Sequence, residues 1–201
     1  MDRGNLKRMA KEQIKGNIGM LFVCSLLMWL CLAAVELVPV LGIVISALVT
    51  PALSIGTMLI YLRLAEGEPV RLETLMERFS IFWKCFVTAF LTVLYCFLWS
   101  LLFVIPGIIK SYSYFMVYFI LAEHPEYSAS QVIQESKRMM DGHKMELFVL
   151  HLTFIPWTLL MIVTFGIAGI YAIPYINATT ANFYNGIKPQ AIVEPALTEF
   201  A

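Results

Sequence analysis

Three polar residues lie at helical spacing in an otherwise apolar stretch of the sequence. Lys110, Tyr114 and Tyr118 stand at positions i, i+4 and i+8, which places them on one face of a helix. An amine beside two phenols in such a setting suits an anionic group. We expect Lys110 to be a structural anchor, either paired with Glu36 or bound to a lipid phosphate. A substrate-binding cation is the alternative.

A second group of polar residues lies in the segment "YAIPYINATTANFYN" (171–185). Amide and hydroxyl side chains inside a membrane need hydrogen-bond partners, so this face is predicted to point into the protein. Interhelical hydrogen bonds are the expected role, and a polar substrate path beside the helix of Lys110 is the alternative. The residues are Asn177, Thr179, Thr180, Asn182 and Asn185.

No enzyme signature is present among the recognised motifs for hydrolases, phosphate binding or dinucleotide binding. The three histidines, His124, His143 and His151, lack metal-ligand spacing. Four carboxylates near predicted loops are expected to be solvated charges, with a metal or a basic partner as the alternative: Glu66, Glu68, Glu123 and Glu126. We therefore predict no catalytic residue, no cofactor, no metal site and no nucleic-acid partner.

The composition is that of a membrane protein. Hydrophobic residues make up 60% of the 201 residues and charged residues 14%, against about 45–50% and about 25% in soluble domains. The charges are clustered and leave long uncharged tracts, each suited to membrane-spanning helices of roughly 20 residues. A chain of this kind lacks the polar surface that a soluble protein of its size needs.

The tracts predict an all-α, polytopic membrane bundle with six transmembrane helices in a single domain, 1–188. Breaks are expected at Pro106-Gly107 and within "TFGIAGI" (164–170). For the first tract, a cleaved signal peptide is the alternative. A C-terminal cytoplasmic tail is predicted at 189–201. The predicted spans are 18–35, 42–62, 85–105, 108–122, 146–165 and 168–187.

Basic residues set the predicted orientation, because they prefer the cytoplasmic side of a membrane. With the N-terminus inside, all fourteen Lys and Arg residues except Lys110 fall on that side. We therefore predict a multi-pass protein of the inner cell membrane with both termini cytoplasmic.

Three short segments between the spans are amphipathic, and we expect them to lie as helices on the cytoplasmic leaflet. Their apolar faces carry Leu6, Met9, Ala10 and Ile14; Leu72, Leu75, Met76 and Phe79; and Val132, Ile133, Ser136, Met139 and Met140. Ser128 is a predicted N-cap for the third. The lysines expected to contact anionic lipid are Lys7, Lys11, Lys15, Lys84, Lys137 and Lys144.

The same segments predict a threefold internal repeat. "AKEQIKGNIGMLF" (10–22) aligns with "SKRMMDGHKMELF" (136–148), which pairs Lys11 with Lys137 and Gly16 with Gly142. A middle copy is indicated by "RFSIFWKCF" (78–86). Each repeat would comprise an interfacial helix followed by a helical hairpin.

The segments "LKRMAKEQIKGNIG", "WSLLFVIPGIIKSYSYFMVYFILAEHPEYSASQVIQESKRMMDGHKMELF" and "AIPYINATTANFY" resemble an uncharacterised bacterial integral-membrane family of the DUF975 type, common in Gram-positive bacteria. The resemblance implies a six-helix membrane protein without an established activity. More distantly, the layout is similar to the membrane domain of some glycerophosphodiester phosphodiesterases, whose catalytic domain has no counterpart here.

Together these features favour a non-enzymatic membrane protein, either a lipid-interacting scaffold or an accessory subunit of a membrane complex. Its expected partners are membrane lipids, chiefly the anionic inner leaflet, and another membrane protein. A small transporter or exporter component, with a polar path between the fourth and sixth helices, is the alternative.

Overall fold

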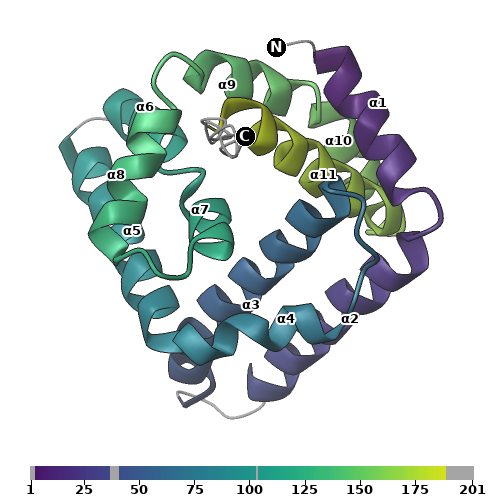
Figure 1. Cartoon of the computed structure of the whole chain (residues 1–201), viewed down its shortest axis with the longest axis horizontal. Coiled ribbons are helices and arrows are strands. Elements are labelled where there is room, and N and C mark those ends of the chain that lie inside the picture. The colour runs from purple at the N-terminus through teal and green to yellow at the C-terminus, as the bar shows by residue number, and fades with distance from the viewer. Residues whose placement is uncertain (1–2, 37–40, 103, 189–201) are drawn as a thin grey trace, which may run out of the picture.

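The computed structural model describes residues 3–36, 41–102 and 104–188, and every element within these ranges is helical (Figure 1). This confirms the all-α class. The predicted tail at 189–201 lies outside the described residues. The helices are α1 (Arg3–Ile14), α2 (Ile18–Glu36), α3 (Leu41–Ala65), α4 (Glu73–Glu77), the 3-10 helix η1 (Arg78–Ile81), α5 (Phe82–Leu102), α6 (Val104–Ser113), α7 (Val117–Glu123), α8 (Ala129–Met139), α9 (Lys144–Leu152), α10 (Ile155–Val163) and α11 (Gly169–Ile187).

Several of these helices are suited to a membrane. Three helical stretches are long and apolar enough to cross one: Val44–Ala65, Glu73–Leu101 and Lys144–Val163. A fourth is present if α1 and Ile18–Leu30, which are bent by 86° to each other, form one broken span. The described residues thus contain three to four candidate spans, where the sequence predicts six, and they indicate a multi-pass membrane protein.

The second helical hairpin, formed by α5 and α6, turns earlier than expected. The sequence predicts a break at Pro106-Gly107, but α6 already begins at Val104 and includes both residues. Proline is tolerated in the first turn of a helix, where its missing N–H has no intrahelical partner. Gly107 lets α5 and α6 approach closely, because a Cβ there would overlap the side chain of Ser100. These two residues therefore begin a helix and pack it, rather than end one.

The predicted fourth span, 108–122, is divided between α6 and α7 by a turn at 114–116. In an unbroken helix the carbonyl of Ser113 would accept the N–H of Val117. Instead Val117 donates to the carbonyl of Tyr114, and the Ser113 carbonyl accepts a 2.9 Å hydrogen bond from the buried hydroxyl of Ser136. A side chain from α8 therefore stabilises the break.

The amphipathic segments form helices, and α8 begins with the predicted N-cap Ser128 in a full capping box. Their apolar faces, however, pack against other helices. The predicted residues Val132 to Met140 are all buried, as are Leu6, Ala10 and Ile14 of α1. Met9, predicted on the same face of α1, is instead exposed. On α4 the burial is partial, since Leu72 and Met76 are exposed. Protein, rather than lipid, thus covers the apolar faces of α1 and α8.

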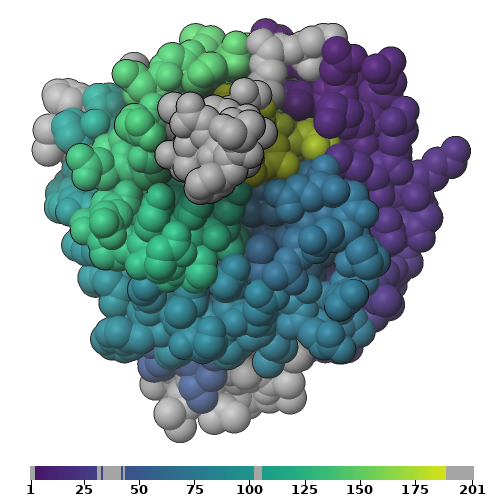
Figure 2. Space-filling view, viewed as in Figure 1, coloured from purple at the N-terminus to yellow at the C-terminus, as the bar shows by residue number. Residues whose placement is uncertain are grey.

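The amphipathic helices close the structure into a ring. Each packs against the last helix of the hairpin before it: α4 against α3, α8 against α7, and α1 against α11. The third contact joins the first helix to the last, and Figure 2 shows the purple N-terminal residues beside the yellow of α11. Helix contacts therefore continue all the way around the centre, although α1 and α11 are far apart in the sequence.

Burial is uneven along the hairpins. Side chains near the amphipathic helices, such as Tyr61, Met116 and Leu147, are almost completely buried. Toward the hairpin ends large apolar side chains are uncovered, with Leu101 72%, Val163 74% and Phe165 97% exposed. Soluble monomers rarely leave extended apolar surface in contact with water. The hairpin ends are therefore the surface that a hydrocarbon phase would cover.

Candidate functional site

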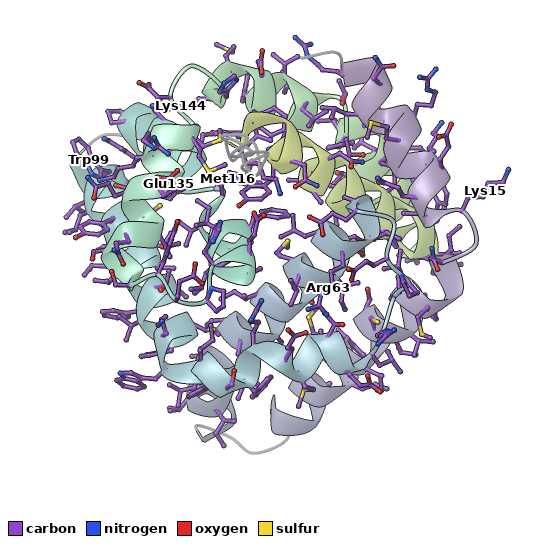
Figure 3. All side chains as sticks on the ribbon, in the orientation of Figure 1. Lys15, Arg63, Trp99, Met116, Glu135 and Lys144 are labelled. Atoms are coloured by element: carbon purple, nitrogen blue, oxygen red, sulfur yellow. The ribbon has the colours of Figure 1, made fainter. Side chains whose placement is uncertain are left out.

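Lys110 lies on α6 and contacts the neighbouring helix. Its amine is 4.6 Å from the centre of the Trp99 ring on α5, a cation–π contact. Figure 3 shows Trp99 at the edge of the molecule, whereas Met116, a few residues beyond Lys110, lies near the middle. The side chain of Glu36 is outside the described residues, so the Lys110–Glu36 pair stays a prediction.

Of the two tyrosines predicted to share a face with Lys110, Tyr114 lies in the turn that breaks the helix and Tyr118 lies beyond it on α7. Tyr114 is buried, and its ring centre is 6.2 Å from that of Tyr95 on α5. Tyr118 is half-buried and packs against the core. Because the turn at 114–116 separates α6 from α7, the i, i+4, i+8 spacing no longer describes a single helical face.

The polar residues of α11 point into the protein, as their types predict. Thr179, Thr180 and Asn182 are buried, and the Thr180 hydroxyl donates to the carbonyl of Ile176 in its own helix. Asn177 lines a cavity of about 340 Å³ between α2, α3 and the start of α11, together with Trp29 and Thr57. This cavity is mostly apolar and does not include Lys110. The structure therefore does not bring the predicted residues of α6 and α11 together.

Three of the lysines predicted to contact lipid lie over aromatic rings. Lys7 of α1 is 5.6 Å from the ring centre of Phe154, and Lys11 is 6.0 Å from that of Tyr175. Lys137 of α8 lies between two rings, 5.8 Å from Tyr95 and 5.4 Å from Tyr114. Each amine therefore sits beside the middle of a long apolar segment.

The remaining three predicted lysines have different surroundings. Lys15 is exposed and points away from the protein (Figure 3). Lys84 donates a 2.6 Å hydrogen bond to the carbonyl of Pro125, and Lys144 pairs with Asp141 at 3.9 Å. Lys84 therefore ties α5 to the loop before α8, which is a structural contact, while Lys15 is available to a headgroup.

One polar cluster was not expected from the sequence. The carboxylate of Glu123, predicted as a solvated loop charge, accepts hydrogen bonds of 2.6 Å from the Tyr184 hydroxyl and 2.8 Å from the Lys188 amine. Burial raises the pKa of Glu123, but the hydrogen bonds from Lys188 and Tyr184 outweigh it and hold the pKa below its ordinary value. The partners follow 61 and 65 positions later, and no local pattern indicates them.

The cluster borders a cavity of about 400 Å³ that also contacts Arg138 and Asn185. The side-chain oxygen of Asn185 is buried there without a hydrogen-bond donor. Arg138 is held by Glu135 through two hydrogen bonds, of 2.6 and 3.0 Å. Within the described residues, no group of three or more His, Cys, Asp or Glu side chains is arranged to hold a metal ion.

Comparison with known proteins identifies the family of the chain but no individual relative. No curated protein and no solved structure matches the chain, so the distant likeness to a phosphodiesterase membrane domain stays a prediction. The sequence matches the family described as "Protein of unknown function (DUF975)" over residues 1–113 and again over 101–191. Because these matches cover most of the sequence, the chain belongs to the DUF975 family.

Proposed function

We propose that this protein is a non-enzymatic, lipid-interacting membrane scaffold or an accessory subunit of a membrane complex. The observation that carries the proposal is the pairing of two surfaces. Uncovered apolar side chains gather at the hairpin ends, of which Phe165 is the most exposed. Exposed basic residues, among them Arg8 and Lys15, follow the outer face of α1. Such a pairing suits the boundary between hydrocarbon and anionic headgroups.

The charges of α1 give the proposal its lipid preference. Each Lys or Arg near an anionic surface contributes about 1 kcal/mol of attraction. Burial, with repulsion from Lys11 and Arg3, lowers the pKa of Lys7, and an anionic headgroup would relieve that repulsion. Anionic lipids should therefore be preferred over neutral ones.

The proposal includes the threefold repeat, with both termini on one side of the membrane. The ring of helix contacts supports it. Two lysines 126 positions apart support it as well. Lys11 lies over Tyr175 of the third hairpin, which α1 packs against, and Lys137 lies over Tyr114 of the second hairpin, which α8 packs against. Gly16 and Gly142 follow α1 and α8 with φ of 96° and 81°, a conformation that favours glycine. Three equivalent units would give one scaffold three similar outward faces.

The test is the lipid that stays bound to the purified full-length chain. The protein is extracted in mild detergent, and its lipids are identified by native mass spectrometry for the wild type and for Lys7→Gln/Lys11→Gln/Lys15→Gln. We expect the wild type to retain anionic lipid and the triple variant to retain severalfold less. Glu12→Gln, an exposed acidic position on the same helix, is the control and should retain at least as much. Equal lipid composition in all three proteins would overturn the proposal.

A further inference from the structure

We propose that the second hairpin (α5–α6) and the end of the third (α10–α11) enter only one leaflet of the bilayer and stop near its centre. The leaflet is the one whose surface carries α1 and α8. This inference rests on the proposed membrane location. It concerns how deeply the protein penetrates, which length and composition alone do not determine.

The helix α1 marks a level at which the protein surface is polar. Its outer residues Arg3 and Arg8 are exposed, as is Lys15 directly after the helix. Charged groups are costly in the hydrocarbon core and reach for the headgroups instead. Lys7 and Lys11 nevertheless lie over Phe154 and Tyr175. Those two rings must therefore lie at the headgroup layer.

The apolar helix that remains beyond that layer in the third hairpin is short. From Tyr175 back to the start of α11 at Gly169 there are six residues, or about 9 Å at 1.5 Å per residue. Beyond Phe154, α10 supplies nine residues, or about 13 Å. The hydrocarbon core is about 30 Å thick, so one leaflet accounts for about 15 Å. The hairpin end fits half of the core.

The second hairpin gives the same length independently. Lys137, exposed on α8, lies over Tyr95 and Tyr114. Beyond Tyr95, seven residues of α5 remain, or about 10 Å. On α6, Lys110 is six residues from the first residue of the helix, or about 9 Å. The Lys110 amine lies over Trp99, which is four residues, or about 6 Å, nearer the hairpin end than Tyr95.

The turn of the third hairpin is chemically suited to hydrocarbon. Backbone N–H groups in lipid must be satisfied within the protein. Every N–H from Thr164 to Gly169 donates a hydrogen bond, five to backbone carbonyls and that of Ala168 to the Thr164 hydroxyl. The side chains presented to the outside are apolar, with Phe165 97% and Ile167 72% exposed. A turn in water is usually polar, and this one is not.

The arrangement of the helices agrees with shallow insertion. Viewed down the shortest axis of the molecule, α3, α5 and α11 are seen lengthwise and run in different directions (Figure 1). Helices that all cross a bilayer would be roughly parallel to one another. The first hairpin is outside the proposal, because α3 extends fifteen residues from Gly56 back to Leu41, about 22 Å.

The depth is tested by single cysteines in the full-length chain, with the native cysteines Cys24, Cys31, Cys85 and Cys96 replaced by alanine. Phe165→Cys and Leu101→Cys report the two hairpin ends, and Lys15→Cys is the matched surface control. A charged maleimide is applied to intact cells, to inside-out vesicles and to detergent extracts. We expect Lys15→Cys to be labelled from one side, and the two hairpin cysteines only after detergent is added. Labelling of Phe165→Cys or Leu101→Cys from either side without detergent would overturn the inference.

A second measurement gives the depth directly. A fluorophore on Phe165→Cys in reconstituted vesicles is quenched by lipids that carry a spin label either at the chain end or at the headgroup. We expect stronger quenching by the chain-end label, and the reverse order would overturn the inference. Label reaching Phe165→Cys from the side opposite Lys15→Cys would leave the scaffold proposal intact. Release of the protein from membranes by alkaline carbonate would instead overturn both proposals.

Discussion

Gln13 of α1 and Asn182 of α11 exchange hydrogen bonds in both directions. The Gln13 amide nitrogen donates to the Asn182 oxygen at 3.1 Å, and the Asn182 nitrogen donates to the Gln13 oxygen at 2.8 Å. Gln13 also donates to the carbonyl of Ala65 at 3.3 Å. This pair of amides therefore joins α1, α3 and α11.

Asn182→Ala should destabilise the protein by about 1–3 kcal/mol, because it leaves the partly buried Gln13 amide without its partner. Gln13→Ala should cost a similar amount, and the double variant little more than either, since residues in direct contact are not additive. Thermal unfolding in detergent measures all three. Gln134→Ala, exposed on α8, is the control and should change little. Losses that simply add would show that the two amides act separately.

Ser136→Ala should destabilise the break between α6 and α7. The variant removes the donor to the buried carbonyl of Ser113, at a cost of about 1–3 kcal/mol. Ser130→Ala removes an exposed hydroxyl from the same helix and should stay within about 0.5 kcal/mol of the wild type. Unfolding temperatures in detergent compare them. Equal stability of the two variants would mean that the break does not depend on α8.

Gly56→Ala should separate α3 from α4. A Cβ at position 56 would overlap the backbone carbonyl of Leu75, whereas one at Gly19 meets nothing within 4 Å. Overpacking of this kind costs about 1–3 kcal/mol, while Gly→Ala in an open helical position is neutral or mildly stabilising. The measurement is thermal unfolding of both variants against the wild type. A Gly56→Ala protein as stable as Gly19→Ala would contradict the close contact.

Glu123 should make stability depend on pH at the acidic end. Its pKa in the folded protein is lower than its ordinary value, so its contribution is complete above about pH 4.5 and is lost as the pH falls through the folded pKa. Glu123→Gln should therefore be less stable than the wild type at pH 7, by about 1.5–3 kcal/mol. This difference should shrink as the pH falls below 4.5.

The control for that prediction is Glu68→Gln. The Glu68 side chain is 58% exposed and 3.8 Å from Arg63, and exposed pairs of this kind contribute little. Its effect should be small at every pH. A Glu123→Gln difference of constant size from pH 7 to below pH 4 would contradict the assignment of a depressed pKa.

Local patterns predict the helices because an apolar tract or a 3.6-residue periodicity can be recognised from residues that are close together in the sequence. For this reason the periodicity predicts the buried face of α8 in full and that of α1 except for Met9, which is exposed. It also identifies the Ser128 cap, which depends on residues three positions apart. It misplaces the turn of the second hairpin because Pro106 is equally compatible with a helix break and with a first helical turn.

Contacts between distant segments account for what the sequence did not reveal. The break at 114–116 depends on Ser136, 23 positions after Ser113, and Gln13 and Asn182 are 169 positions apart. Among the candidate site residues, the inward face of Asn177 and Thr180 follows from their polarity alone. The distance between Lys110 and Asn177 depends instead on how the hairpins pack, which no single segment encodes.

Closure of the ring between α1 and α11 has a consequence for biosynthesis. The ribosome produces α1 first and its main packing partner last, so the apolar face with Leu6, Ala10 and Ile14 emerges long before α11 exists to cover it. During translation that face must rest on a membrane surface or a chaperone, and it is released only when the last helix arrives. A nascent chain stalled before residue 169 would therefore keep its N-terminal helix open to proteases, and completion of α11 would protect it.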